Sequence, residues 1–132
     1  MPESMSKAER EKFYTDFLTT EGYLPEKEMD DFVGFRKGNM GFVIPVDDDV
    51  DYVSIMSPFL EIKPDTDVAK AIHVGHEVMA TTKVAKVYIA ENTVWVAVEI
   101  LCRPPEALKS VFGRCMVSLE WAAEQFQERM KA

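Results

Sequence analysis

The first hydrophobic pattern along the chain repeats every three to four residues, which is the period of an α-helix. Its members are Phe13, Tyr14, Phe17 and Leu18. Ser6 followed by Glu9 is a capping-box pair, which favours a helix start at this point. We therefore expect a helix that begins at Ser4 or Ser6 and ends at about Glu21. Gly22 follows at once and favours termination.

Three stretches with the alternation and composition of β-strands come next, at residues 31–37, 40–46 and 50–62. Gly38 and Asn39 tolerate the positive φ of a tight turn, so the first two strands are predicted to form a hairpin. An acidic turn at residues 47–49 separates the second strand from the third. Pro58 is expected to interrupt the third strand, because proline has no N–H to donate to a sheet.

A second helix is predicted to open within residues 64–67, with Asp65 or Thr66 as its N-cap. It should end near Thr81 or Thr82. Spacings of three and four residues predict its buried stripe, which consists of Val68, Ile72, Gly75 and Met79.

A second hairpin and a third helix complete the pattern. Residues 83–91 and 93–102 are predicted strands with a turn at 91–92. Alternation predicts one fully apolar face on the second of these strands, formed by Val94, Val96, Val98 and Ile100. The last helix is expected to begin at residues 104–105 and to run to about Arg129. Its apolar stripe is Leu108, Phe112, Cys115, Leu119, Ala122 and Phe126.

These elements predict a fold of class α+β, in the order α-β-β-β-α-β-β-α. Short connections make the neighbouring strands antiparallel, and the helices are expected to cover one face of the sheet. The result is a two-layer sandwich with an antiparallel sheet of about five strands. A length of 132 residues fits a single domain over residues 1–132.

The sheet face opposite the helices is the candidate protein-binding surface. In a two-layer sandwich this face should be polar, but the pattern places several apolar side chains on it. The candidate residues are Val84, Lys86, Tyr88, Trp95 and Ala97, with Val43 and Pro45 as neighbours. Exposed apolar patches of this kind mark contact sites, so we expect either a homodimer contact or a polypeptide client here.

Charge and composition narrow the class of partner. The net charge is −8, from 23 acidic and 15 basic residues, and an acidic surface disfavours nucleic acids and anionic membranes. No stretch reaches the roughly 18 apolar residues that cross a bilayer. A charged run at residues 9–12 replaces the apolar region of a signal peptide, so we expect a cytoplasmic protein. In that setting Cys102 and Cys115 should be reduced thiols, with Cys115 packed in the core.

The local cluster most similar to a metal site is formed by His73, His76 and Glu77. Two histidines three residues apart on a helix can converge on one ion. The order differs from the zinc-protease patterns, and a third ligand would have to be a distant carboxylate. We expect His76 to pack beside Ile72 and Met79, with His73 outward, and predict no metal.

Asp47, Asp49 and Asp51 alternate as in a calcium loop, but the glycine and glutamate that such a loop requires are Tyr52 and Pro58 here. We therefore interpret this cluster as a solvated turn.

Catalytic motifs are missing from the sequence. There is no Gly-x-Ser-x-Gly, no phosphate-binding loop and no dinucleotide-binding glycine pattern. The acidic pairs Glu26 with Glu28 and Asp30 with Asp31 are expected in a loop, where carboxylates are simply solvated. The chain is therefore predicted to be no enzyme and to hold no cofactor.

Several hydrophobic motifs nevertheless resemble a known family. They are Phe17-Leu18, Glu21-Gly22-Tyr23, residues 41–47 and residues 83–89. These motifs resemble the YbjN-like proteins, which are small bacterial domains described as regulators of sensory transduction. The order of elements is also similar to that of the class I chaperones of type III secretion. The resemblance spans residues 13–126, although residues 80–82 lack an asparagine that is common in the family.

The resemblance implies a non-enzymatic, dimeric protein of the bacterial cytoplasm. We predict a protein-binding regulatory module with an unknown protein partner. One alternative is a type III secretion chaperone-like protein that binds an extended client segment, since those chaperones are also small and acidic. A second is a small metal-binding protein or enzyme using His73 and His76, and a third is a structural subunit of a larger assembly.

Overall fold

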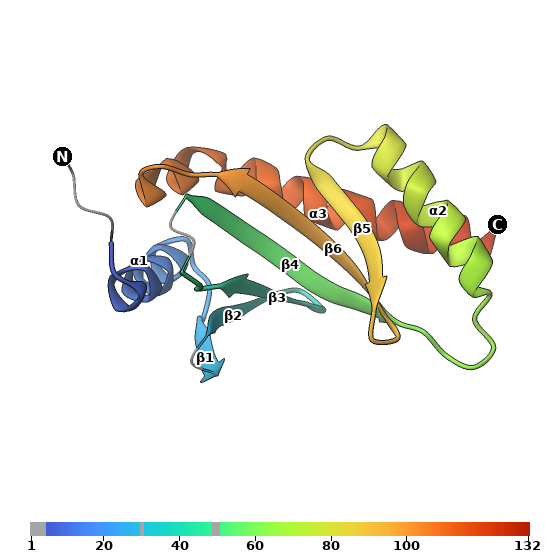
Figure 1. Ribbon diagram of the computed structural model, residues 1–132, viewed down its shortest axis with the longest axis horizontal. Coiled ribbons are helices and arrows are strands. Elements are labelled where there is room, and N and C mark those ends of the chain that lie inside the picture. The colour runs from blue at the N-terminus through green and yellow to red at the C-terminus, as the bar shows by residue number, and fades with distance from the viewer. Residues whose placement is uncertain (1–4, 30, 49–50) are drawn as a thin grey trace.

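The structure is a computed structural model that describes residues 5–29, 31–48 and 51–132 (Figure 1). Its elements are α1 (Lys7–Thr20), β1 (Glu26–Met29), β2 (Phe32–Lys37), β3 (Met40–Pro45), β4 (Tyr52–Glu61), α2 (Val68–Thr81), β5 (Ala85–Ala90), β6 (Thr93–Leu101), a 3₁₀ turn η1 (Pro105–Ala107) and α3 (Leu108–Lys131). The predicted class and order are confirmed, with one additional short strand, β1. Asp30, Asp49 and Val50, which belong to predicted turns and strand ends, lie outside the described residues.

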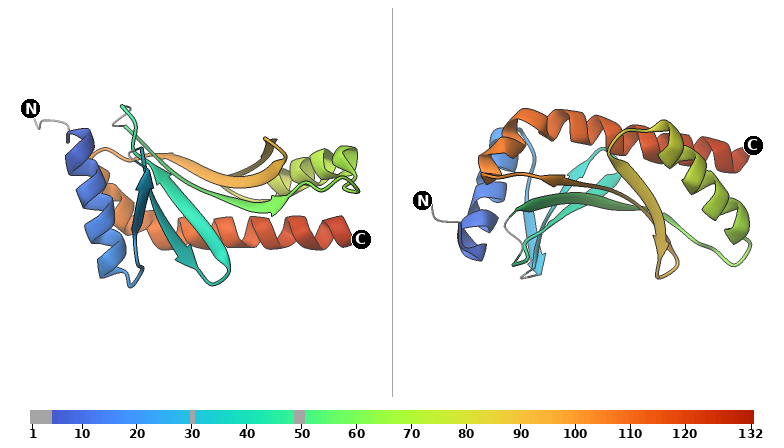
Figure 2. Two further views of the ribbon diagram at one scale, coloured as in Figure 1. Left: turned by 90° about the horizontal axis from the view of Figure 1, so that it is seen from below. Right: turned by 45° about the horizontal axis from the view of Figure 1, so that its top comes forward.

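The sheet is antiparallel throughout, with its strands in the order β1-β2-β3-β4-β6-β5. It bends strongly around the long helix α3, so that β1–β3 and β4–β6 lie on different sides of it (Figure 2). The bend falls where β3 meets β4, whose pairing is centred on Val43 and Met56. The buried Ser57 adds a link across this junction, because its hydroxyl donates to the carbonyl of Gly41 at 2.6 Å. The predicted irregularity at Pro58 is present as a register shift against β6.

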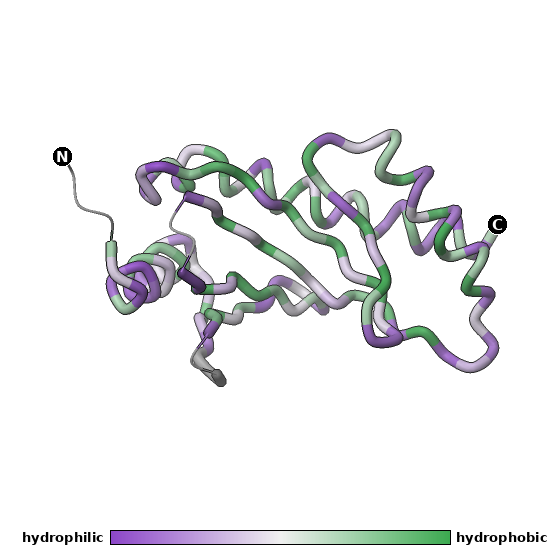
Figure 3. The backbone as a smooth tube through the Cα atoms, viewed as in Figure 1, coloured by the Kyte–Doolittle hydropathy of each residue, from purple (hydrophilic) through white to green (hydrophobic). Residues whose placement is uncertain are grey.

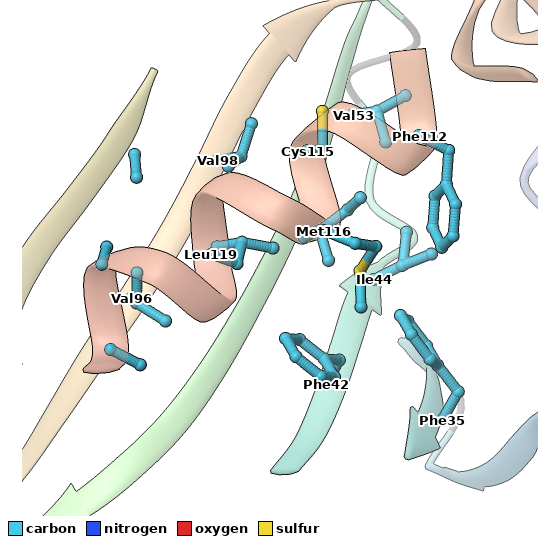
Figure 4. Close-up of a cluster of buried hydrophobic side chains, with 14 of the residues drawn as sticks. Phe35, Phe42, Ile44, Val53, Val96, Val98, Phe112, Cys115, Met116 and Leu119 are labelled. Carbon is cyan, nitrogen blue, oxygen red and sulfur yellow. The ribbon is translucent and has the colours of Figure 1, made fainter. Parts of the chain in front are cut away.

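The core lies between the sheet and α3. Hydrophobic and hydrophilic positions alternate around α3 (Figure 3). All six residues of its predicted stripe are buried. Figure 4 shows side chains of α3 facing those of four strands, among them Phe112, Cys115, Met116, Leu119, Phe35, Phe42, Ile44, Val53, Val96 and Val98. One continuous hydrophobic cluster therefore joins the helices to one face of the sheet.

Helix α1 closes one end of this core. The predicted capping box is present, since the side chain of Ser6 accepts from the N–H of Glu9 and the Glu9 carboxylate accepts from the N–H of Ser6. Arg10, part of the charged run, is buried, and its Nη2 donates to the backbone carbonyl of Asp47 just beyond β3. The hydrogen bond of this charged residue thus links α1 to the end of the β2–β3 hairpin.

The predicted buried stripe of α2 is wrong in its angular position. Val68, Ile72 and Met79 are exposed, and Gly75 alone of the predicted set is buried. The buried residues are Ala71, Val74, Gly75 and Val78. At about 100° per residue, the two sets lie about a quarter turn apart on the helix. Apolar residues cover both adjoining faces of α2, so the period alone could not select the face that packs on β5 and α3.

Two local predictions near strand and helix starts also need correction. Residues 26–29 form strand β1, which pairs with β2, whereas the sequence predicted a loop there. The N-cap of α2 is Asp67, whose side chain accepts from the N–H of Lys70, and the predicted caps Asp65 and Thr66 lie before it. Within the described part of the chain, no helix is long and apolar enough to cross a membrane.

Candidate functional site

The helix-free face of the sheet carries four of the five predicted binding residues. Side chains alternate along a strand, and Ala85 and Val87 of β5 point into the core. Lys86 and Tyr88 therefore lie on the opposite face. Across the strand pair they stand opposite Ala97 and Trp95 of β6, which alternate with the buried valines 94, 96 and 98.

Tyr88 and Trp95 form the centre of this face. Their rings are stacked with centroids 6.4 Å apart and planes 3° apart. Pro58 of β4 pairs with Trp95 on its other side, so the two rings and the proline make one row across three strands. Tyr88 is exposed and Trp95 is half-buried. Partial burial raises the pKa of the Tyr88 hydroxyl, which therefore remains a neutral hydrogen-bond donor at physiological pH.

The next row of the face is more polar. Lys86 Nζ and Glu99 Oε1 form an ion pair at 2.6 Å. Ala97 is fully buried although it lies on this face, because it sits in the row between Met56 and Lys86. Ala97 therefore contributes no exposed surface to the patch, and the expectation that it is exposed is wrong.

Val84 is separated from the other four candidates. It does not belong to β5, because its backbone has a φ of 60° and the N–H of Ala85 donates to the carbonyl of Lys83 at 2.7 Å. A β-branched residue rarely adopts this left-handed conformation. The turn directs the chain away from the helix-free face, and Val84 borders a cavity on the side of α3 instead.

This cavity has a volume of about 740 Å³ and lies between the end of β6, the segment at Lys83 and Val84, and the first half of α3. Both cysteines line it, and both are free thiols, as predicted. Cys115 is buried as expected, and Cys102 is buried as well. Sequence reasoning missed the cavity. The available signal was Val117, an apolar residue of α3 that lies outside the buried stripe and is exposed.

The predicted metal cluster does not assemble. His73 and His76 are both exposed, so the expectation that His76 packs against the core is wrong. Glu77 is engaged by Arg129, with Nη1 to Oε2 at 3.7 Å, and by His73, with Nε2 to Oε1 at 3.5 Å. Among the described residues, no three histidine, cysteine, aspartate or glutamate side chains gather as a metal would require.

Comparisons with known proteins give structural relatives only. No model of a protein family matches the chain, and no curated protein does. The crystal structure of YbjN from E. coli, described as a candidate transcription regulator, superposes with a TM-score of 0.63 over 85% of this chain and 87% of that one. The identity is 11%. The chain has the YbjN-like fold.

A second structure with a similar fold comes from a chaperone–effector complex. A chain of the HopA1–SchA chaperone–effector complex superposes with a TM-score of 0.65, at 13% identity, over 96% of this chain and 99% of that one. Both predicted resemblances are thus confirmed at the level of the fold. Identities this low carry no residue-level function, so the functional argument rests on the surfaces described above.

The reactivity of the two cysteine thiols tests whether they are buried in this YbjN-like core. Burial raises the pKa of Cys102 and Cys115, and raised pKa values leave less of the reactive thiolate. In native protein at neutral pH we expect iodoacetamide to alkylate both thiols more than about tenfold slower than in denaturant. Mass spectrometry of timed samples measures this. Equal rates in the native and denatured states would contradict the buried placement.

Proposed function

We propose that the chain is a non-enzymatic, protein-binding regulatory module of the bacterial cytoplasm that acts as a homodimer. The observation that carries this proposal is the stacked pair of Tyr88 and Trp95 on the helix-free sheet face. Aromatic side chains with a polar atom at one end are enriched in protein interfaces, because they bury much apolar area and still satisfy a hydrogen bond. The YbjN-like fold agrees with a regulatory role.

The helix-free face has the composition of a protein contact. Its centre is aromatic and apolar, while the ion pair of Lys86 and Glu99 lies at its side. Interfaces combine such an apolar centre with a polar rim. A rigid sheet under the rings holds them in place, so little conformational freedom is lost when a partner binds. We therefore assign partner binding to this face.

A different surface suits the dimer contact. The exposed residues Val68, Ile72 and Met79 lie on one side of α2, and Ile72 is 62% exposed. A dimer with twofold symmetry brings the same patch of both subunits together, and an apolar helix face can pack against its own copy. We assign self-association to this face of α2.

Two glutamate substitutions separate these assignments. Ile72→Glu should reduce the mass measured by light scattering from about twice 15.0 kDa to the monomer value, because a charge cannot be buried at a helix contact without a partner. Trp95→Glu should leave the dimer intact but abolish capture of the partner from a lysate of the source bacterium, quantified by mass spectrometry. Ala80→Glu, at an exposed position of α2, is the matched control and should behave as wild type in both assays.

Each assignment can fail separately. A wild-type protein that is monomeric at micromolar concentration would refute the dimer. Capture of the same partner at wild-type yield by the Trp95→Glu variant would refute the helix-free face as its binding site. Circular dichroism spectra of all three variants should match that of wild type, since Ile72 and Ala80 are exposed and Trp95 points away from the core.

A chaperone-like role is the second candidate function, favoured by the near-complete overlap with a chain of a chaperone–effector complex. In that case the captured protein should be held through an extended segment. Hydrogen exchange on the complex distinguishes the two roles. A regulator would leave the partner's folded core protected, whereas a chaperone-like protein would hold a segment that is unfolded when free.

A further inference from the structure

The cavity beside α3 has the dimensions of a small-molecule site. Its volume of about 740 Å³ lies within the range of about 300–1,000 Å³ that is usual for ligand pockets. It arises because β6 continues beyond its partner. Ala85 of β5 pairs with Val98, so no described strand pairs with residues 99–101 on that side. The space is bounded by the chain turn at Val84 and by the first half of α3.

Several apolar side chains that line the cavity are exposed to solvent. Val84, Leu101 and Val117 line it and are 61%, 71% and 65% exposed. At its base lie Cys102 and Cys115, whose pKa values are raised by burial, as in apolar surroundings. An apolar occupant would remove the part of this surface that it contacts from water, which is favourable in proportion to the area buried.

The charged residues that line the cavity are both basic. They are Lys83 and Arg114, in a protein with a net charge of −8. Neither forms an ion pair with another described residue, whereas several other lysines of the chain pair with carboxylates. Two such cations beside an apolar hollow match an occupant with an apolar body and a negative charge.

The open edge of β6 favours a small occupant over an added peptide strand. Cys102 donates its N–H to the carbonyl of Asp51, so by alternation the N–H and C=O of Leu101 point towards the cavity. The open edge spans residues 99–101 only, because Val98 still pairs with Ala85 and β6 ends at Leu101. So short an edge cannot pair with a strand of ordinary length. The N–H of Leu101 can still donate a hydrogen bond to a carboxylate oxygen of a small ligand.

We propose that this cavity binds an amphipathic monocarboxylate, with its apolar chain along Val84, Leu101 and Val117 and its carboxylate beside Lys83 and Arg114. Such a molecule satisfies both the apolar walls and the two cations. This inference goes beyond the proposed function and does not depend on it, because neither Tyr88 nor Trp95 lines the cavity.

The test is a titration of the full chain, labelled with ¹⁵N, with decanoate, hexanoate and decyltrimethylammonium, followed by NMR. Decanoate should shift the amides of Val84, Leu101 and Val117. It should bind at least about tenfold more tightly than hexanoate, because every buried methylene adds to affinity. The cation of equal chain length should bind more weakly than decanoate, and added salt should weaken only the binding of the anions.

A pair of charge-matched variants tests the role of the basic side chains. The double variant Lys83→Glu with Arg114→Glu should lose about tenfold or more in decanoate affinity, since two attractions become repulsions. Lys12→Glu with Lys131→Glu changes the net charge equally at exposed sites that do not line the cavity, and should bind as wild type.

Several results would overturn the proposal. These are equal binding of decanoate and the cation, unchanged affinity in the Lys83 and Arg114 double variant, shifts confined to the helix-free face, or no shift at millimolar decanoate. A Trp95→Glu protein should still bind decanoate, so failure here and failure of the proposed function are distinguishable.

Discussion

Replacing Phe112 with alanine should lower the free energy of unfolding by about 3–5 kcal/mol, the usual cost of removing a buried phenylalanine ring. Phe112 is 2% exposed and lies where three elements meet. Its ring contacts Phe17 of α1 at 5.2 Å between centroids, and Tyr23 and Phe35 at 6.1 Å each. The cavity left by alanine could not close without moving α1, because these neighbours come from separate parts of the chain.

Urea denaturation followed by circular dichroism measures this change. Val117→Ala is the matched control, since it truncates an exposed residue of the same helix and should change stability by no more than about 0.5 kcal/mol. A loss below about 1 kcal/mol for Phe112→Ala would mean that the contact between α1, β2 and α3 is looser than described. The two variants together therefore test whether this end of the core is tightly packed.

The elements with one clear apolar face were predicted correctly from sequence. The alternation in β6 and the stripe of α3 each specify a single inward face, and the structure buries every residue that the patterns select except Ile100, which is half-buried. Turn residues were equally informative. Gly38 has a φ of 60°, and the two residues at the β5–β6 turn, Glu91 and Asn92, also have positive φ, as a tight hairpin requires.

The prediction failed where local sequence does not encode the deciding contact. Strand β1 has the sequence Glu-Lys-Glu-Met, with no apolar alternation, because it lies at the edge of the sheet and pairs only with β2. Edge strands are often charged, which discourages pairing with other chains. The exposed face of α2 was assigned to the core for the opposite reason, since it is apolar without being covered by the described chain.

The candidate site was half predictable. Period-two alternation alone placed Lys86, Tyr88, Trp95 and Ala97 on one face of the sheet. The same alternation extended to Val84 gave the wrong position, because a single residue with positive φ ends the strand. The cavity depends on how many residues of β6 extend beyond β5 and on which side chains of α3 lie beside them. A pattern of hydrophobic and polar positions along the sequence contains no information on how the elements are placed relative to one another.

Gly75 of α2 should tolerate alanine but not leucine. A β-carbon placed there would lie 3.4 Å from Cγ1 of Val87 and 3.9 Å from Cε2 of Phe126. Alanine therefore just fits, and its helix propensity offsets the tight contact. The further atoms of leucine have no room between α2, β5 and α3, so Gly75→Leu should lower the free energy of unfolding by about 1–3 kcal/mol.

Gly113 supplies the control for this comparison. It is an exposed glycine within α3, and a β-carbon there would have no neighbour within 4 Å. Gly113→Leu should raise the free energy of unfolding by about 0.5–1 kcal/mol, because any good helix former restricts the unfolded chain more than glycine does. Denaturation midpoints of Gly75→Ala, Gly75→Leu and Gly113→Leu measure the contrast. If leucine were as well accepted at Gly75 as at Gly113, α2 would not lie directly on β5. The orientation of α2 on the core would then be different, and the apolar face to which we assign the dimer contact would not be the exposed one.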